Sequence, residues 1–323
     1  MRRAEPGRSE FLLQVRDEAG DDVGRRGRRR RRLRCSPSST VNRDHVRSVL
    51  SGNMNRAGLK WPIAAVFLAI AITSTMDATG FTVFSALPLF ALTAGLWIVQ
   101  RMSRGEVGLR FGRPRDYGLA LLHPLLVIGA LTVIAVSASA GHLDHVPWKR
   151  IGTRVLISAL LGPIMGLLTE EGFFRGALWA SLKRAGRSDV MVLLWTSLAF
   201  ALWHISAVVL NTGFNPPPSQ VPLFLVNAFV MGAIWGCLRA ISGSIIVSSV
   251  CHSIWNAIAY SLYGFGTKVG ALGVRDTSLF APEVGLLGLI LNVVFLAIVF
   301  AWWRRNARHD AALPNLAAPA AIG

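Results

Sequence analysis

The sequence predicts an all-α polytopic membrane protein with about eight spanning helices. Hydrophobic residues make up 52% of the 323 residues, charged residues make up only 16%, and the mean hydropathy is +0.47. Soluble domains carry ~25% charged residues, and several apolar stretches of this chain approach the ~20 residues that a spanning helix needs. No stretch alternates polar and apolar residues as the strands of a membrane barrel do, so we expect a helical bundle.

The expected spans are the apolar stretches, taken in order along the chain. They cover residues 62–79, 81–99, 118–139, 152–180, 190–210, 221–239, 244–263 and 283–303. The first is the weakest, and the fourth is longer than one crossing needs and carries charged residues near its end. Two of the links are only a few residues long, which indicates tightly packed helical hairpins.

The distribution of Lys and Arg in the short links predicts the orientation. With the N-terminus inside, fourteen basic residues flank the spans on the inner side and five on the outer side. We therefore expect an integral protein of the bacterial plasma membrane with both termini in the cytoplasm, since the Arg-, Ala- and Gly-rich composition indicates a bacterial source. Cys35, Cys237 and Cys251 form no paired extracellular framework, so we expect no disulfides.

The first 53 residues differ from the rest of the chain. They carry 14 Lys and Arg against 7 Asp and Glu, with little apolar content. A polybasic arm on anionic lipid, a nucleic-acid tail and disorder without a role are the interpretations left open, although we expect no nucleic-acid partner. Met54 begins a natural cytoplasmic lead into the first span, so the true start could lie there. We divide the chain into a disordered basic arm (1–53), a membrane domain (54–309) and a disordered tail (310–323).

Three charged residues, Glu170, Glu171 and Arg175, lie within six positions of the fourth apolar stretch. A charge in the middle of a bilayer costs ~3 kcal/mol on insertion scales, so these residues need partners and a purpose. Glu171 precedes Arg175 by four positions, which is the favourable acid-before-base order on a helix. Glu170 points about 100° away and needs partners from other helices. Of the acidic residues after Met54, only the two glutamates lie deep in an expected span.

Two later spans carry polar residues at the spacing of one helical turn. Phe200 precedes His204 by four positions, and His252 precedes Asn256 by four. At 1.5 Å per residue, Glu170, His204 and His252 lie ~20, ~24 and ~14 Å from their nearest inner links, so they can share one bilayer layer. A lone intramembrane His is commonly a helix–helix contact, whereas this set at matching depth indicates function.

Other polar and small residues in the spans have simpler interpretations. The Gly232-x-x-x-Gly236 ridge predicts close helix packing, because small residues let helices approach. Asn227 is interpreted as structural. His123, which precedes Pro124 near a span start, is interpreted as non-catalytic.

The polar set predicts amide hydrolysis. A carboxylate beside neutral imidazoles can deprotonate water, and His and Asn donors can hold the developing oxyanion. Alternatively, Glu170, His204 and His252 could bind zinc as a two-His, one-Glu set. No HExxH and no GxSxG motif is present. We expect no tightly bound metal and keep zinc as the alternative.

These residues resemble the CPBP family, which comprises type II CAAX prenyl endopeptidases and related abortive-infection and bacteriocin-immunity membrane proteins. The family pattern places Glu-Glu-x-x-x-Arg, Phe-x-x-x-His and His-x-x-x-Asn/Asp on three helices. The matching segments are Glu170-Glu171-Gly-Phe-Phe-Arg175, Phe200-Ala-Leu-Trp-His204 and His252-Ser-Ile-Trp-Asn256. Each motif is weak alone, but three in this order within spans are specific, and the resemblance covers about residues 150–260.

The resemblance implies an eight-helix intramembrane endopeptidase in which Glu170 activates the water. The paired Glu171 and Arg175 would support this base, and His204 would position or assist it. His252 and the Asn one turn after it would stabilise the oxyanion. The expected substrate is a membrane-associated peptide or protein, and membrane lipid is the expected surrounding partner.

Two other function classes remain open. A non-catalytic immunity or scaffold protein could bind a partner through the same cavity, and a proton-coupled transporter could use intramembrane Glu and His as a relay. Intact motifs favour the enzyme over the scaffold, and the absence of an evident internal repeat argues against a common transporter plan.

Overall fold

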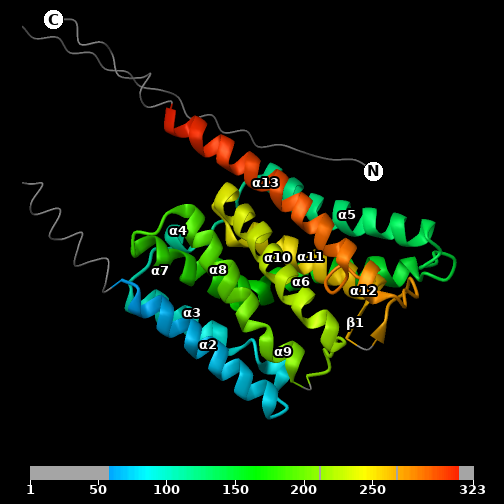
Figure 1. Cartoon of the computed structure of the whole chain (residues 1–323). Coiled ribbons are helices and arrows are strands. Elements are labelled where there is room, and N and C mark those ends of the chain that lie inside the picture. Colours follow the sequence, from blue (N-terminus) through cyan, green and yellow to red (C-terminus); the bar gives the residue numbers. More distant parts are fainter. Residues whose placement is uncertain (1–57, 211, 267, 313–323) are drawn as a thin grey trace, which may run out of the picture. The chain divides into compact units, whose positions relative to one another are not determined.

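The computed structural model describes residues 58–210, 212–266 and 268–312, all within one compact unit of the chain (Figure 1). The expected arm (1–53) and the question of a start at Met54 lie outside the described residues, as do Cys35 and residues 313–323. Within the described part, eight helices are long and apolar enough to cross a membrane. These helical stretches are Lys60–Ala78, Thr82–Val99, Pro114–Ser137, Trp148–Leu168, Asp189–Val209, Pro218–Ser242, Ile245–Leu262 and Leu286–Asn306. The predicted polytopic helical bundle is therefore confirmed.

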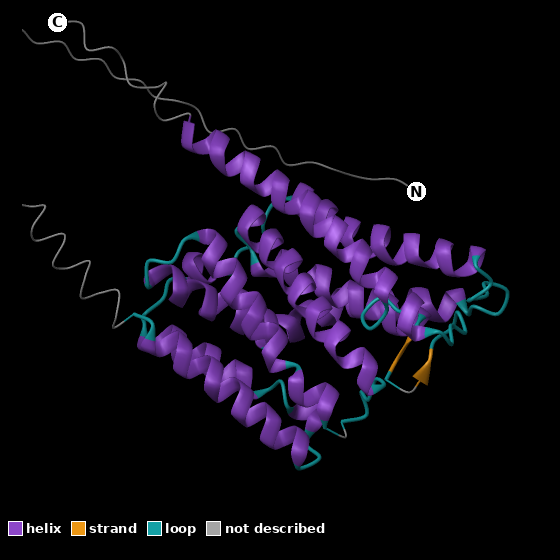
Figure 2. Cartoon of the chain, viewed as in Figure 1, coloured by secondary structure: helices purple, strands orange, loops and turns teal. Residues whose placement is uncertain are grey.

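Helices account for nearly all of the regular structure in the described part, as Figure 2 shows. The elements before the charged motif are α2 (Lys60–Ala78), η1 (Thr82–Phe84), α3 (Pro88–Val99), α4 (Arg104–Val107), α5 (Pro114–Ser137) and α6 (Trp148–Leu168). They are followed by η2 (Glu171–Leu178), α7 (Trp179–Arg184), α8 (Asp189–Trp203), α9 (Ile205–Val209), η3 (Pro218–Gln220), α10 (Val221–Ser242) and α11 (Ile245–Leu262). The last elements are β1 (Gly264–Phe265), β2 (Lys268–Val269), α12 (Thr277–Phe280) and α13 (Leu286–Ala312). The two short strands pair antiparallel as a small hairpin.

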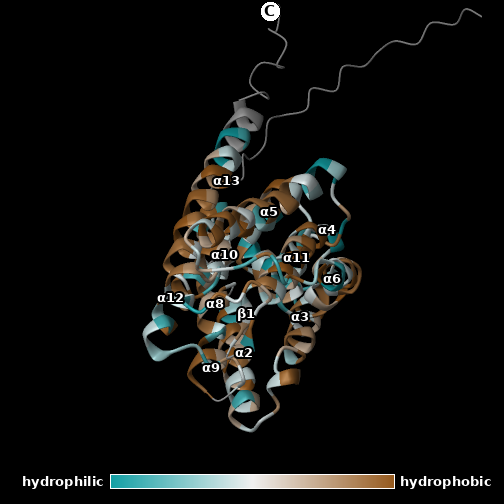
Figure 3. Ribbon diagram, turned by 90° about the vertical axis from the view of Figure 1, so that its right-hand side faces the viewer, coloured by the Kyte–Doolittle hydropathy of each residue, from teal (hydrophilic) through white to brown (hydrophobic). Residues whose placement is uncertain are grey.

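Helices α10 and α11 form the centre of the bundle. Helix α11 packs against α6, α5 and α10, while α10 also packs against α8 and α13. The outer helices expose large apolar side chains such as Phe67 on α2 and Ile98 on α3, and Figure 3 shows hydrophobic residues along most of the helices. In a bilayer such side chains face lipid, so the buried polar residues gather between the central helices.

The fourth apolar stretch is not one helix, which corrects the expected span over 152–180. Helix α6 ends at Leu168, and Thr169 leaves helical geometry with φ −122° and ψ −107°. A π-helix, η2, then carries the charged motif before the chain returns to an α-helix in α7. A Cβ atom on Gly172 would lie 2.0 Å from the Leu167 carbonyl oxygen, so this approach requires glycine. π-Helical turns occur frequently at functional sites.

Candidate active site

The buried ion pair at the motif is formed by Glu171 and Arg175. Glu171 Oε1 lies 3.2 Å from Arg175 Nη1, and both side chains are fully buried. The expected i, i+4 pairing is thus present, although on a π-helix. Arg175 Nη2 also donates to the Gly232 carbonyl at 3.1 Å, and the guanidinium lies 4.3 Å from the centre of the Phe200 ring. The Phe of the second motif therefore holds the Arg of the first through a cation–π contact.

The glycine ridge on α10 allows this approach. A Cβ on Gly232 would lie 3.3 Å from Arg175 Nη2, and a Cβ on Gly236 would lie 2.4 Å from Leu193 of α8. The interpretation of the ridge as a packing feature is confirmed, and Gly232 additionally makes room for the guanidinium.

His252 on α11 links the two carboxylates of the motif. Its Nδ1 donates to Glu171 Oε1 at 3.2 Å, and its Nε2 lies 4.0 Å from Glu170 Oε2. The Trp235 indole stacks on the imidazole, with ring centres 3.9 Å apart and planes 19° apart. The hydrogen bond to Glu171 at the ring edge and the Trp235 indole on the ring face together fix the orientation of the His252 imidazole. The sequence did not single out Trp235, because an aromatic residue between the two ridge glycines looks like any other apolar core residue.

His204 lies at the C-terminal end of α8, where the chain passes into α9. Its Nδ1 donates to the Phe200 carbonyl at 2.8 Å, so in the neutral imidazole Nε2 is left as an acceptor. The His204 ring also packs edge-on against Phe200 and Trp203, with centres 4.5 Å and 4.8 Å apart. The four-residue spacing of the second motif therefore sets both the tautomer and the orientation of the ring.

Glu170 differs from Glu171 in access. The side chain of Glu170 is 22% exposed, whereas that of Glu171 is fully buried, so Glu170 is the carboxylate that a substrate or water can reach. Asn256 lies one turn beyond His252 on α11 and is half-buried. The structure brings Glu170, Glu171, Arg175 and His252 into direct proximity, joins His204 through Phe200, and places Asn256 by its helix face alone.

Several buried polar atoms of this cluster make no hydrogen bond within the described part of the chain. They are Glu170 Oε2, Glu171 Oε2, and Arg175 Nε and Nη1. Most buried polar groups in proteins are hydrogen-bonded, and an unpaired group calls for a specific reason. A site that receives a water molecule and a substrate supplies such a reason.

Comparison with known proteins identifies the segment that contains this cluster. Residues 152–258 match the family model of Rce1-like type II CAAX prenyl endopeptidases. This segment is therefore similar to the Rce1-like family. The match confirms the resemblance drawn from the three motifs, and all of the predicted site residues, from Glu170 to Asn256, fall within it. It supports an intramembrane protease of the CAAX type. No curated protein matches the chain.

The arrangement of the ionisable side chains decides whether the Rce1-like segment can hold a metal ion. Among the residues that the structure describes, no group of three or more His, Cys, Asp and Glu side chains is placed to hold a metal ion. Glu170, His204 and His252 do not form a zinc-binding set in this geometry. Metal dependence stays a prediction.

A second cluster of buried polar residues lies among α5, α10, α11 and α13, and it includes residues that the sequence did not single out. His123 is fully buried within α5, where its Nε2 lies 2.9 Å from Asn292 Oδ1 of α13. Asn292 in turn donates to Asn227 Oδ1 at 3.0 Å, which supports the structural interpretation of Asn227. Glu283, in the link before α13, is also buried, since it is 8% exposed and accepts from Trp255 Nε1 at 3.0 Å.

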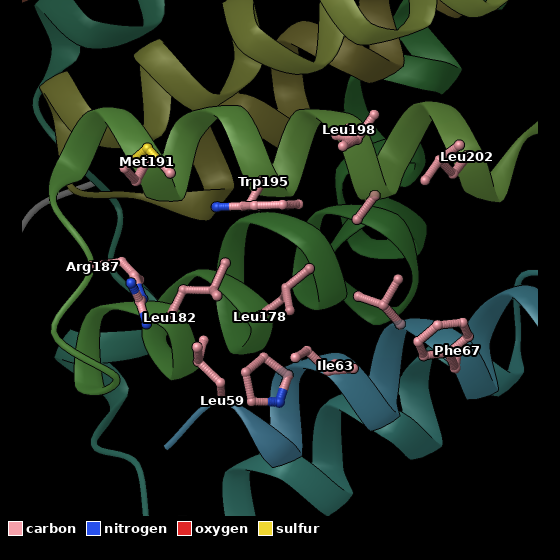
Figure 4. A pocket seen from close by; sticks show the side chains of 13 residues that line it. Leu59, Ile63, Phe67, Leu178, Leu182, Arg187, Met191, Trp195, Leu198 and Leu202 are labelled. Atoms are coloured by element: carbon pink, nitrogen blue, oxygen red, sulfur yellow. The ribbon is translucent and has the colours of Figure 1, made fainter. Parts of the chain in front are cut away.

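An apolar groove of about 360 Å³ borders the Rce1-like segment on its other side (Figure 4). Leu178, the last residue of the π-helix, and Leu182 of α7 line it together with Ile63 of α2 and Trp195 of α8. Arg187, in the link before α8, is the one charged residue of this lining. The segment that carries the charged motif thus also contributes Leu178 and Leu182 to an apolar groove.

Proposed function

We propose that the protein is an intramembrane endopeptidase that hydrolyses a peptide bond in a membrane-associated peptide or protein. The observation that carries this proposal is the pairing of an accessible carboxylate with an oriented imidazole inside the Rce1-like segment. Glu170 Oε2 lies 4.0 Å from His252 Nε2. One water molecule can contact both atoms at ~2.8 Å, which is a normal hydrogen-bond length.

In the proposed reaction, Glu170 is the general base. Its carboxylate takes a proton from this water, and the resulting hydroxide adds to the carbonyl carbon of the scissile amide. The oxyanion that forms accepts hydrogen bonds from the Asn256 amide and from His252 Nε2–H. Glu170 then returns its proton to the amide nitrogen, the C–N bond breaks, and a carboxylic acid and an amine are released.

The buried pair Glu171 and Arg175 supports His252 in this scheme. The Glu171 carboxylate accepts from His252 Nδ1 at 3.2 Å, so it stabilises the imidazolium that can donate from Nε2. Arg175 balances the charge of Glu171 and ties it to α10 through the Gly232 carbonyl. His204, held by the Phe200 carbonyl, would present its unprotonated Nε2 toward the reacting groups and assist the base.

The surroundings of the segment fit a substrate that resides in the membrane. The groove beside η2 and α7 is lined almost entirely by apolar side chains (Figure 4), which suits the apolar part of such a substrate. We also propose that the protein lies in a bacterial plasma membrane with both termini in the cytoplasm.

The proposal is tested by comparing new N-termini in membrane proteomes of cells that express wild-type protein, Glu170→Ala or His204→Ala. We expect a set of cleavage products with the wild type that both variants lose, although both remain folded in detergent. Asp189→Asn, an exposed acid paired with Lys183, is the matched control and should retain cleavage. Retention of all products by Glu170→Ala would show that catalysis is not the function. Elemental analysis of tag-free protein tests metal dependence, and stoichiometric zinc would overturn the metal-free scheme.

A further inference from the structure

A cavity of about 450 Å³ lies next to the candidate active site, among the chain segments that follow α9 and α11. Aromatic rings of Phe214, Tyr260, Tyr263 and Phe265 line it. Phe214 and Phe265 stack with ring centres 4.6 Å apart, and Tyr260 lies 4.7 Å from Phe265. The lining therefore presents flat, electron-rich faces to whatever enters.

A shared helix face and a series of ring contacts connect this cavity to the proposed catalytic residues. Along α11, His252, Asn256 and Tyr260 follow one another at four-residue spacing and share one helix face, so the cavity begins one turn beyond the predicted oxyanion donor. From the other side, Phe224 lies 5.9 Å from His204 and 5.1 Å from Phe214. A peptide that crosses the catalytic centre would place a neighbouring residue in this cavity.

The cavity contains one buried carboxylate, that of Glu283, which is 8% exposed. Its Oε1 accepts from Trp255 Nε1 at 3.0 Å, and among the described residues the carboxylate forms no salt bridge. Asn227 holds the segment in place by donating to the Pro282 and Glu283 backbone carbonyls at 2.8 Å and 3.0 Å. Burial raises the pKa of the Glu283 carboxyl to about 7, against the lowering effect of the Trp255 N–H. A buried carboxylate of this kind gains most from a cationic partner.

We propose that this cavity is a substrate subsite that binds a Lys or Arg side chain near the scissile bond, with Glu283 as its carboxylate partner. The aromatic faces of Tyr260 and Phe265 would surround the cation, because the ring quadrupole attracts positive charge. Lys268 and Arg275 also line the cavity, but both are exposed, so solvent and salt screen their repulsion. This inference rests on the proposed endopeptidase function for the identity of its ligand.

Cleavage selectivity provides the first test. Purified protein in detergent is incubated with a peptide library made by digesting a bacterial proteome, and the residues around each cleaved bond are counted. We expect Lys or Arg to be enriched at one position for the wild type, and Glu283→Gln to reduce the ratio of basic to neutral residues there at least about tenfold, or ~1.4 kcal/mol. Asp189→Asn, which neutralises an exposed acid outside the cavity, should retain the enrichment. Cleavage by the wild type without any basic enrichment would overturn the proposal.

A binding measurement separates failure of the subsite from failure of the protease function. The unfolding temperature of the full chain in detergent is recorded with n-pentylammonium or with 1-pentanol at equal concentration, since a ligand that binds the folded state stabilises it. The amine should raise the unfolding temperature more than the alcohol does, and Glu170→Gln, used as the control acid, should keep this difference. Glu283→Gln should abolish the difference; if that variant does not fold, Glu283→Asp should reduce it. Equal effects of amine and alcohol on the wild type would exclude the cation site even if peptides are cleaved.

Discussion

Helix α11 contributes to two buried polar clusters that differ in how completely they are hydrogen-bonded. The charged cluster, formed by Glu170, Glu171, Arg175 and His252, contains four buried atoms without a hydrogen bond in the described part of the chain. Beside it, a second set of polar residues on four helices is joined by polar contacts and one ring stack. This neutral cluster consists of His123, Asn227, Asn292, Cys251 and Trp255.

This difference in hydrogen bonding indicates separate roles for the two clusters. In the neutral cluster, none of the side-chain nitrogen and oxygen atoms is left without a partner, and the Trp255 ring stacks on His123 with centres 4.6 Å apart. Such a network rigidifies a core. The charged cluster has an accessible carboxylate and a π-helical backbone instead, and both features are costly unless function requires them. The neutral cluster therefore holds α11 in place beside the charged cluster.

The largest expected effect on stability comes from removing one partner of the buried ion pair. Arg175→Met leaves Glu171 as an uncompensated buried charge, which typically costs 3–5 kcal/mol. We expect this loss in the free energy of unfolding in detergent, measured by denaturant titration. The double variant Glu171→Gln/Arg175→Met removes both charges and should recover part of the loss. If Arg175→Met alone were as stable as the wild type, the charged cluster would not be held together by this pair.

A smaller effect is expected from Gly172→Ala. The added Cβ would meet the Leu167 carbonyl oxygen at 2.0 Å, and this backbone contact cannot move away as a side chain could. We expect a loss of about 2–3 kcal/mol, as for overpacking, together with loss of cleavage because the charged motif is displaced. Gly166→Ala is the matched control, since its nearest contact is the Ser249 side chain at 3.4 Å. Equal tolerance of both substitutions would contradict the requirement for glycine in η2.

The sequence predicted a bundle with eight spans, because hydropathy reports the length of each apolar stretch directly. Four-residue spacing also predicted that Glu171 and Arg175 would pair, whereas the roles of the site residues stay predictions. The sequence did not predict the break at Thr169, because the polar run Thr169-Glu170-Glu171 that begins there contains no helix-breaking proline or glycine. It also left open which partner each side chain of the cluster would meet. His252 contacts both glutamates only because α11 packs against α6 and η2, and spacing along one helix contains no information on such packing. Glu283 escaped notice because its depth depends on the fold of the segment before α13.

The neutral cluster provides a prediction of intermediate size. Asn292→Ala would remove the partner of His123 Nε2 and of Asn227 Oδ1, leaving buried polar atoms unpaired at a cost of about 1–3 kcal/mol. We expect lower unfolding free energy with the same cleavage sites, measured by denaturant titration and product mass spectrometry. Val293→Ala, at a 46% exposed position of α13, should be nearly neutral in the same assays. A change of cleavage sites in Asn292→Ala would assign the neutral cluster a direct part in substrate selection.

The smallest effect on stability is expected at the exposed ion pair of Glu106 and Arg184. This pair differs from the buried pair of Glu171 and Arg175 in its exposure to solvent. Glu106 of α4 accepts from Arg184 Nε at 2.7 Å and from Nη2 at 2.9 Å, at the end of the segment that carries the charged motif. The Arg184 guanidinium and the Ser103 backbone N–H lower the pKa of Glu106 from 4.5 to about 2. Because the folded-state pKa is the lower one, the stabilisation is fully present above pH ~4.5 and disappears as the pH falls toward 2.

The side chains of this pair are 38% and 39% exposed, so solvent screening limits its contribution to less than about 1 kcal/mol. We expect Glu106→Gln to lower the unfolding free energy by that amount at neutral pH, with the difference from wild type shrinking as the pH falls below 4.5 and as salt is added. The effect of Arg175→Met should persist in high salt, since solvent ions do not reach a fully buried pair. If the two substitutions responded equally to salt, burial would not be what distinguishes the charged cluster from an ordinary surface pair.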